Sequence, residues 1–310
     1  MNYREFMMRL GNQPMELHEE WRLSLEMLAT SHSPNDENHP QAIADALNLS
    51  APVKVNPRAA GSIAIVPLRG FMQPREDIWT RMGFATSTEA FARNVRAAVQ
   101  DPNVKAVLFD VDSGGGFVSG VPEACDSIYK LRGQTPMVAV SNMMMASAAL
   151  HVASSADEIV TPPSSLTGSI GVWTVVFDEM KAWEMLGIEP FMVKAGKFKA
   201  LGNGYEPVTK EVVSRLQERV DRDYGRFVEH IARNRGVKAA DVRNGFGQGD
   251  VCDGKESVAN GLSDRVATLE ETLARFGAPP QSSDTSASRA AIAELQRDVV
   301  NARYREPAQI

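Results

Sequence analysis

The pattern of apolar and polar positions divides this chain into a regular middle and two irregular ends. In the middle, short apolar runs alternate with stretches whose apolar residues recur every three or four positions, which predicts buried strands alternating with amphipathic helices. Strands are predicted at 62–68, 104–112, 136–141, 158–177 (a pair) and 189–194, and helices at 86–100, 118–131, 147–155, 178–186 and 208–235. This alternation predicts an α/β fold with a parallel sheet.

The two ends of the chain lack this alternation of strands and helices. Residues 1–30 have the apolar spacing of a helical segment, and residues 31–60 are rich in Pro, Asn and Ser, which is typical of a linker around one short helix. After residue 276 the stretch G-A-P-P-Q-S-S-D-T-S-A-S predicts a flexible linker, and residues 289–303 could form an amphipathic helix. The predicted organisation is therefore 1–60, a domain over 61–276, and 277–310.

Composition and charge narrow the range of possible functions and partners. The chain has 310 residues, 43% hydrophobic and 23% charged, as expected for a globular protein. A net charge of −6 argues against nucleic acid as a partner. Two distant cysteines, Cys125 and Cys252, predict neither a disulfide framework nor a zinc site, so a reducing, cytoplasmic location and no metal are expected. The charged N-terminus lacks the apolar core of a signal peptide.

One serine lies inside the most apolar stretch. Residues 133–156 contain no charged side chain, which leaves a membrane span as an alternative to a buried strand followed by a buried helix. Polar residues and Pro136 within the stretch favour the buried strand and helix. Ser147 then falls at the strand-to-helix junction, where a serine is either a helix cap or a nucleophile beside N–H groups that could hold an oxyanion.

A glycine-rich stretch, D-S-G-G-G-F-V-S-G at 112–120, follows a predicted buried strand. Its glycines allow unusual backbone conformations and leave N–H groups accessible to an anion, although a tight turn alone would also explain them. The spacing matches neither a P-loop nor a dinucleotide-binding motif.

A nucleophilic serine needs a base. Of the histidines, only His151 is near Ser147 in sequence, and at four residues along one helix its ring would rarely reach the hydroxyl. The run M-V-K-A-G-K-F-K at 192–199 offers Lys194, Lys197 and Lys199 instead, although a solvated basic loop is the ordinary interpretation. A lysine base must be neutral, and an apolar wall without acidic side chains favours the neutral form. The stretch around Ser147 is such a wall.

These residues together resemble the signal peptide peptidase A family of Ser-Lys peptidases, particularly its phage members that act in capsid assembly. The similarity covers about residues 61–270. The family's glycine turn corresponds to 113–116, its nucleophile segment to A-S-A-A-L-H-V-A-S-S-A-D-E-I at 146–159, its T-G-S-I-G-V signature to 167–172, its G-K-Y-K to 196–199, and its late G-L-x-D motif to 261–264.

The resemblance implies a ClpP/crotonase fold and a serine endopeptidase without a cofactor. It implies Ser147 as nucleophile, Lys199 as general base and Ser169 as the residue that orients the lysine. It also implies an oxyanion hole made by the N–H of Ala148 and that of Gly115 or Gly116. Family members form homo-oligomeric rings in which a neighbouring subunit can supply the lysine.

The sequence departs from the family pattern at three points, of which the last bears on the substrate. Gly114 replaces a proline of the family turn, Ala148 and Ala149 replace a glycine pair, and the membrane anchor of typical bacterial members is not found in the sequence. The expected substrates are therefore soluble proteins, such as capsid or scaffold proteins, in the host cytoplasm or a procapsid. The alternatives are a peptidase that degrades signal peptides or misfolded proteins, a crotonase-like acyl-CoA enzyme, and an inactive scaffold protein.

Overall fold

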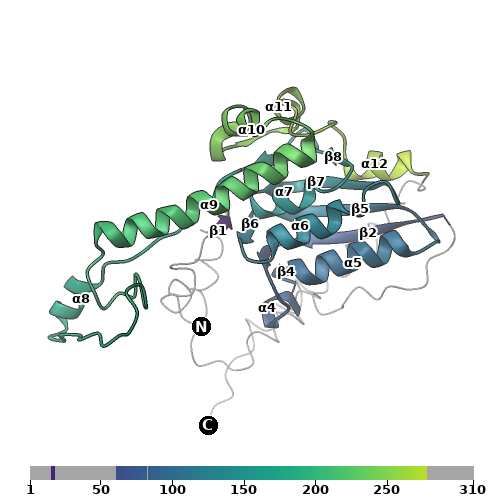
Figure 1. Ribbon diagram of the computed structural model, residues 1–310. Coiled ribbons are helices and arrows are strands. Elements are labelled where there is room, and N and C mark those ends of the chain that lie inside the picture. The colour runs from purple at the N-terminus through teal and green to yellow at the C-terminus, as the bar shows by residue number, and fades with distance from the viewer. Residues whose placement is uncertain (1–14, 18–60, 82, 278–310) are drawn as a thin grey trace, which may run out of the picture.

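The computed structural model describes residues 15–17, 61–81 and 83–277 of the chain (Figure 1). The predicted linker at 31–60 and the predicted tail helix at 289–303 lie outside these residues. Within them, Met15–Leu17 is a strand, β1, so the predicted helix over residues 1–30 is wrong at this point. The reason is tertiary: β1 is paired with a strand about one hundred residues away, which local helical spacing does not report.

The main sheet has six strands and is mostly parallel. They are β2 (Ser62–Arg69), β5 (Val104–Ser113), β7 (Met137–Ala146), β8 (Glu158–Val160), β9 (Leu166–Gly168) and β10 (Val251–Cys252). The order is β10-β9-β7-β5-β2, with β8 also pairing with β7, and only β10 runs antiparallel to its neighbour. The predicted α/β class with a parallel sheet is confirmed.

Both faces of the sheet are covered, which explains the nearly continuous apolar strands. One face carries the larger core, in which Val107, Phe109 and Val111 of β5 are buried with side chains from the helices. The other face carries a smaller core around Leu108, Val138 and further apolar residues near the chain's described end. The side chains of alternate β5 residues therefore pack into the two different cores.

Helices α5 (Thr88–Gln100), α6 (Val121–Tyr129), α7 (Ala148–Ala153) and α9 (Lys210–Arg235) supply the larger core (Figure 1). The predicted buried strand and helix over 133–156 are confirmed, because β7 and α7 occupy this stretch and all of α7 is buried. No helix of the described part of the chain combines the length and apolarity needed to cross a bilayer. On the other face, α12 (Leu269–Arg275) contacts β7.

A second, four-stranded sheet lies beside the main one. It consists of β1, β6 (Gly115–Phe117), β3 (Phe71–Gln73) and β4 (Ala85–Ser87), in the order β1-β6-β3-β4. The glycine-rich stretch is thus a short strand rather than only a turn. Gly116 lies so close to β3 that a Cβ would come within 2.0 Å of the Met72 carbonyl oxygen, so a side chain at this position cannot be accommodated.

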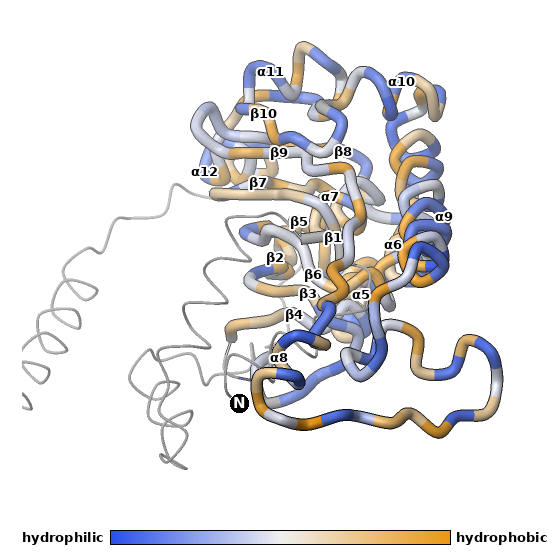
Figure 2. Tube along the Cα trace, turned by 90° about the vertical axis from the view of Figure 1, so that its left-hand side faces the viewer, coloured by the Kyte–Doolittle hydropathy of each residue, from blue (hydrophilic) through white to orange (hydrophobic). Residues whose placement is uncertain are grey.

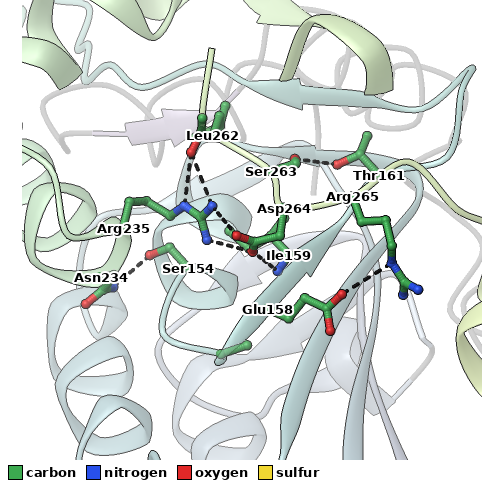
Figure 3. A network of polar contacts seen from close by, with 12 residues as sticks. Ser154, Glu158, Ile159, Thr161, Asn234, Arg235, Leu262, Ser263, Asp264 and Arg265 are labelled. Carbon is green, nitrogen blue, oxygen red and sulfur yellow. Dashed lines mark hydrogen bonds and ion pairs between the residues drawn. The ribbon is translucent and has the colours of Figure 1, made fainter. Parts of the chain in front are cut away.

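Helix α9 joins the body to a segment that stands apart from it. We call residues 171–209 the arm; it contains α8 (Met180–Met185) and meets the N-terminal end of α9, away from the two sheets (Figures 1 and 2). The C-terminal end of α9 is fixed to the body instead. Figure 3 shows Arg235 bound to Asp264 at 2.7 Å and Asn234 bound to Ser154 at 2.8 Å.

The remaining elements connect these parts. They are α4 (Ile78–Arg81), α10 (Ala239–Gly245), a 3₁₀ turn (Gly247–Gly249) and α11 (Gly254–Ala259). Two predictions fail locally. Residues 189–194 form no strand, because the arm offers no sheet edge to pair with. The helix predicted over 86–100 begins at Thr88 instead, because residues 85–87 form β4 and the Ser87 hydroxyl caps α5 by accepting from the Ala90 N–H.

Candidate active site

Ser147 lies between the end of β7 and the start of α7, as predicted, and occupies the N-cap position, but its side chain forms no capping hydrogen bond. Its backbone has φ 56° and ψ −122°, a region that residues with a side chain rarely adopt. Its N–H donates to the Gly168 carbonyl at 2.9 Å, and its carbonyl accepts from the His151 N–H at 2.8 Å. Strain of this kind is typical of a serine held in a fixed position at the end of a strand. In this single chain Ser147 is 1% exposed.

Ser169 is brought beside Ser147 by strand pairing. In the parallel pair β7 and β9, Ala146 is opposite Gly168, so Ser147 and Ser169 are the next residues on neighbouring strands. Neighbouring strands lie about 5 Å apart. Ser169 also has a positive φ of 55°, and its N–H donates to the Asp250 carbonyl at 2.7 Å. Two strained serines therefore adjoin at the carboxyl edge of the parallel sheet.

The candidate oxyanion residues reach the same edge. Ser113, at the end of β5, pairs with Met145 of β7, and β6 begins two residues after Ser113 and contacts α7. The Ser113 hydroxyl donates to the Gly70 carbonyl at 2.6 Å and accepts from the Gly115 N–H at 3.1 Å. The Gly115 N–H is thus already bound within the turn, and it would have to change partner to hold an oxyanion. Gly116 follows it on β6.

Asp112 is a residue near this edge that the sequence analysis did not select. It directly precedes Ser113, and its Oδ1 is buried with no hydrogen-bond partner in the described residues. Burial raises the pKa of Asp112, although the Arg69 guanidinium opposes this effect. The neighbouring Asp110 binds Arg69 and accepts from Asn142 at 3.0 Å. The alternation D-V-D in a predicted buried strand was the signal that could have identified this acidic pair.

Lys199 is not part of this cluster in the single chain. It is exposed and lies in the arm, where its N–H donates to the Gly196 carbonyl. The contacts around it are internal to the arm and the start of α9: Lys197 pairs with Glu211 at 2.7 Å, and Arg215 stacks on Phe198. No hydrogen bond or ion pair joins Lys199 to Ser147 within the described residues. The structure thus gathers every other predicted site residue at one edge and leaves the predicted base apart.

The ring of His151, the histidine near Ser147 in sequence, packs against α9. The ring of His151 stacks on Phe227, and its Nε2 lies 2.9 Å from Nδ1 of His230 on α9, so this nitrogen faces α9. With Cys125, these two residues form a group whose ligand atoms all lie within 4.8 Å and which could hold a metal. Without an ion the group already has partners, since the Cys125 sulfur accepts from the Asn234 amide at 3.3 Å.

The sequence is similar to known peptidases and phage proteins. Residues 130–278 match the profile of peptidase family S49. The head-tail preconnector protein GP5 of Enterobacteria phage P21 is 28% identical over 250 residues, which are 77% of this chain and 49% of the relative. The capsid assembly protease C of Escherichia phage lambda is 28% identical over 211 residues, 68% of this chain and 48% of the relative. The chain thus spans about half the length of both relatives.

Among solved structures, a mutant of ClpP1 from Listeria monocytogenes superposes with a TM-score of 0.40 at 12% identity, over 76% of this chain and 99% of the other.

Proposed function

We propose that this chain, which carries a domain of peptidase family S49, is a serine endopeptidase whose active site is completed by a second copy of the chain. One observation carries this proposal: Ser147 sits strained and buried on the body, whereas Lys199 is exposed on an arm that extends from the far end of α9. We therefore propose that the Ser-Lys pair forms between two copies of the chain, with Ser147 from one copy and Lys199 from the other.

The proposed chemistry uses the side chains in defined roles. The Ser147 hydroxyl attacks the scissile carbonyl carbon while Lys199 of the neighbouring copy accepts its proton. The N–H of Ala148 and that of Gly115 or Gly116 stabilise the oxyanion, and loss of one such donor typically costs about 10²–10³ in rate. Lys199 then protonates the leaving amine. Water attacks the acyl-enzyme with Lys199 again accepting the proton, and Ser147 is regenerated. Ser169 would orient the lysine.

The surface of the arm supports assembly of copies. The surface of a monomeric protein rarely exposes a large group of apolar side chains. Most of those in the described residues lie on the arm: Phe177, Met185, Leu186, Ile188, Phe191, Val193, Phe198 and Tyr205. A second copy that covers them would bring the arm against a body, and a lysine buried there would be favoured in its neutral form.

The proposed substrates are capsid or scaffold proteins. The support comes from two relatives, of which one is a phage capsid assembly protease and the other a phage head-tail preconnector protein. Incubation with a phage scaffold protein should give defined fragments, whereas incubation with a signal peptide should give slower cleavage. The reverse preference would favour a signal-peptide or general degradative role.

A complementation experiment tests the shared site. Ser147→Ala and Lys199→Ala should each abolish hydrolysis of a quenched fluorescent peptide, with losses of about 10³-fold or more. An equimolar mixture of the two inactive variants, dissociated and reassembled together, should recover part of the activity, because some sites then combine an intact Ser147 with an intact Lys199.

The matched control is Lys197→Ala, a neighbouring arm lysine that pairs with Glu211 and should retain activity. If both single variants are inactive and the mixture stays inactive, the dyad forms within one chain. If Ser147→Ala still cleaves the peptide, Ser147 is not the nucleophile and the proposed function is wrong.

A further inference from the structure

Strand β1 pairs with one edge of β6, the strand that contains the candidate oxyanion glycines. The pairing is antiparallel, with Leu17 opposite Gly115, Glu16 opposite Gly116 and Met15 opposite Phe117. The other edge of β6 is taken by β3. Figures 1 and 2 both draw β1 against β6. The chain's own N-terminal segment therefore occupies the remaining edge of the strand that carries the candidate oxyanion glycines.

This edge has the properties of a peptide-binding site. A peptide can add to an exposed strand edge through its main chain, whatever its side chains, and a peptidase that accepts varied sequences needs such contacts. The scissile carbonyl must also come within about 3–3.5 Å of the nucleophile. β6 adjoins α7, which begins at Ser147, and two of its three residues are glycines, so its backbone can be approached closely.

We propose that Met15–Leu17 is a built-in competitor that occupies the substrate-binding edge of β6, and that it must leave before a protein substrate can bind. The inference rests on the proposed function, because it assigns to this edge the peptide that Ser147 attacks. The occupant is specified by the observed pairing: residues 15–17 of the same chain, run antiparallel to β6.

An internal competitor has a defined kinetic signature. A tethered segment is present at an effective concentration of about millimolar, so it competes even when its intrinsic affinity is modest. Competition lowers the fraction of chains able to bind substrate and raises KM by the reciprocal of that fraction. It leaves kcat unchanged, because a chain that has bound substrate no longer holds β1.

Proline substitution in the full chain tests this. Successive N–H groups of a strand point to opposite sides, so one of Glu16 and Leu17 directs its N–H toward β6, and the Glu16→Pro/Leu17→Pro variant removes it. We expect KM for an added peptide to fall about tenfold with kcat unchanged. The matched control is Ser31→Pro/His32→Pro, which places two prolines outside β1 and should leave KM unchanged.

A binding measurement separates this inference from the peptidase proposal. In a Ser147→Ala background, a labelled peptide of residues 11–21 should bind the Glu16→Pro/Leu17→Pro chain about tenfold more tightly than the chain with intact β1, by fluorescence anisotropy. This readout needs no catalysis.

Equal affinities, or an unchanged KM with a lowered melting temperature, would make β1 a structural edge strand and overturn the inference while the peptidase proposal stands. Absence of cleavage in every variant would overturn the peptidase proposal alone.

Discussion

At the scale of single residues, Ser147 combines features that seldom occur together. It is almost fully buried, it has a positive φ, and its neighbour across the strand pair, Ser169, has one too. A residue with a Cβ in such a region costs of order 1–3 kcal/mol, and glycine does not carry this cost. The surrounding strand and helix therefore hold Ser147 in a backbone conformation that a serine rarely adopts.

This strain predicts a difference between two inactive variants. Ser147→Gly should unfold with a free energy about 1 kcal/mol higher than Ser147→Ala, because glycine relieves the positive φ and alanine does not. Urea denaturation of the two proteins measures the difference. If alanine proves equal to or more stable than glycine, the backbone at Ser147 is not strained in solution.

At the scale of elements, a buried histidine, His151, and a partly buried one, His230, link α7 to α9. His151 and His230 share a hydrogen bond of 2.9 Å, and Asp126 of α6 lies 3.6 Å from the other nitrogen of His230. Burial, followed by the charge of His151, lowers the pKa of His230 to about 4, against the opposing effect of Asp126; Arg233 and Arg226 lower it further.

The lowered pKa predicts a loss of stability in mild acid. Between pH 6.5 and about 4 the unfolded chain binds a proton at His230 that the folded chain does not, so the unfolding free energy should fall as the pH falls through this window. The largest loss expected from this residue is about 3 kcal/mol. Denaturation curves from pH 7 to 4.5 measure the slope. His230→Gln should flatten it, and an equally steep slope in that variant would assign the loss to other groups.

Helices and strands also differ in how well their sequences predict them. Long strands and helices with clear periodicity, such as β5 and α9, are close to their predicted bounds. Short strands such as β3, β4 and β6 were not predicted, since three residues carry no readable period. The predicted strand at 189–194 is wrong for a related reason: Ile188, Phe191 and Val193 have strand-like character but no neighbouring edge.

At the scale of the whole molecule, the exposed apolar arm is the feature that a single chain leaves unexplained. Phe191 is 80% exposed and Val193 is 96% exposed, so substitution at either position removes little packing within the chain. The same side chains would be covered if copies assemble through the arm. Their effect on assembly and on folding can therefore be separated.

We expect Phe191→Glu/Val193→Glu to lower the mass of the assembled protein in sedimentation while the melting temperature stays within about 2 °C. Peptidase activity should fall with assembly, because the proposed site draws Lys199 from another copy. Lys181→Glu is the matched control, since it also places a carboxylate on the exposed arm without removing an apolar side chain. An unchanged mass in the double variant would exclude these residues from the interface.

The sequence by itself determined the α/β class, the resemblance to a peptidase family and the position of Ser147 at a strand-to-helix junction. These follow from local patterns: apolar runs that must be covered, and short motifs in a fixed order. The family match to residues 130–278 confirms the resemblance. The assignment of Lys199, Ser169, Ala148 and the two glycines to catalysis stays a prediction.

Tertiary structure alone decided which of these residues meet. Strand pairing brings Ser147 and Ser169 to one edge of the main sheet, β6 contacts α7, and β1 pairs with β6, although these segments are far apart in the chain. It also separates Lys199 from Ser147 by putting the arm at the far end of α9. Contacts between distant segments depend on which edges and faces remain free after the core is packed, and no local pattern encodes that.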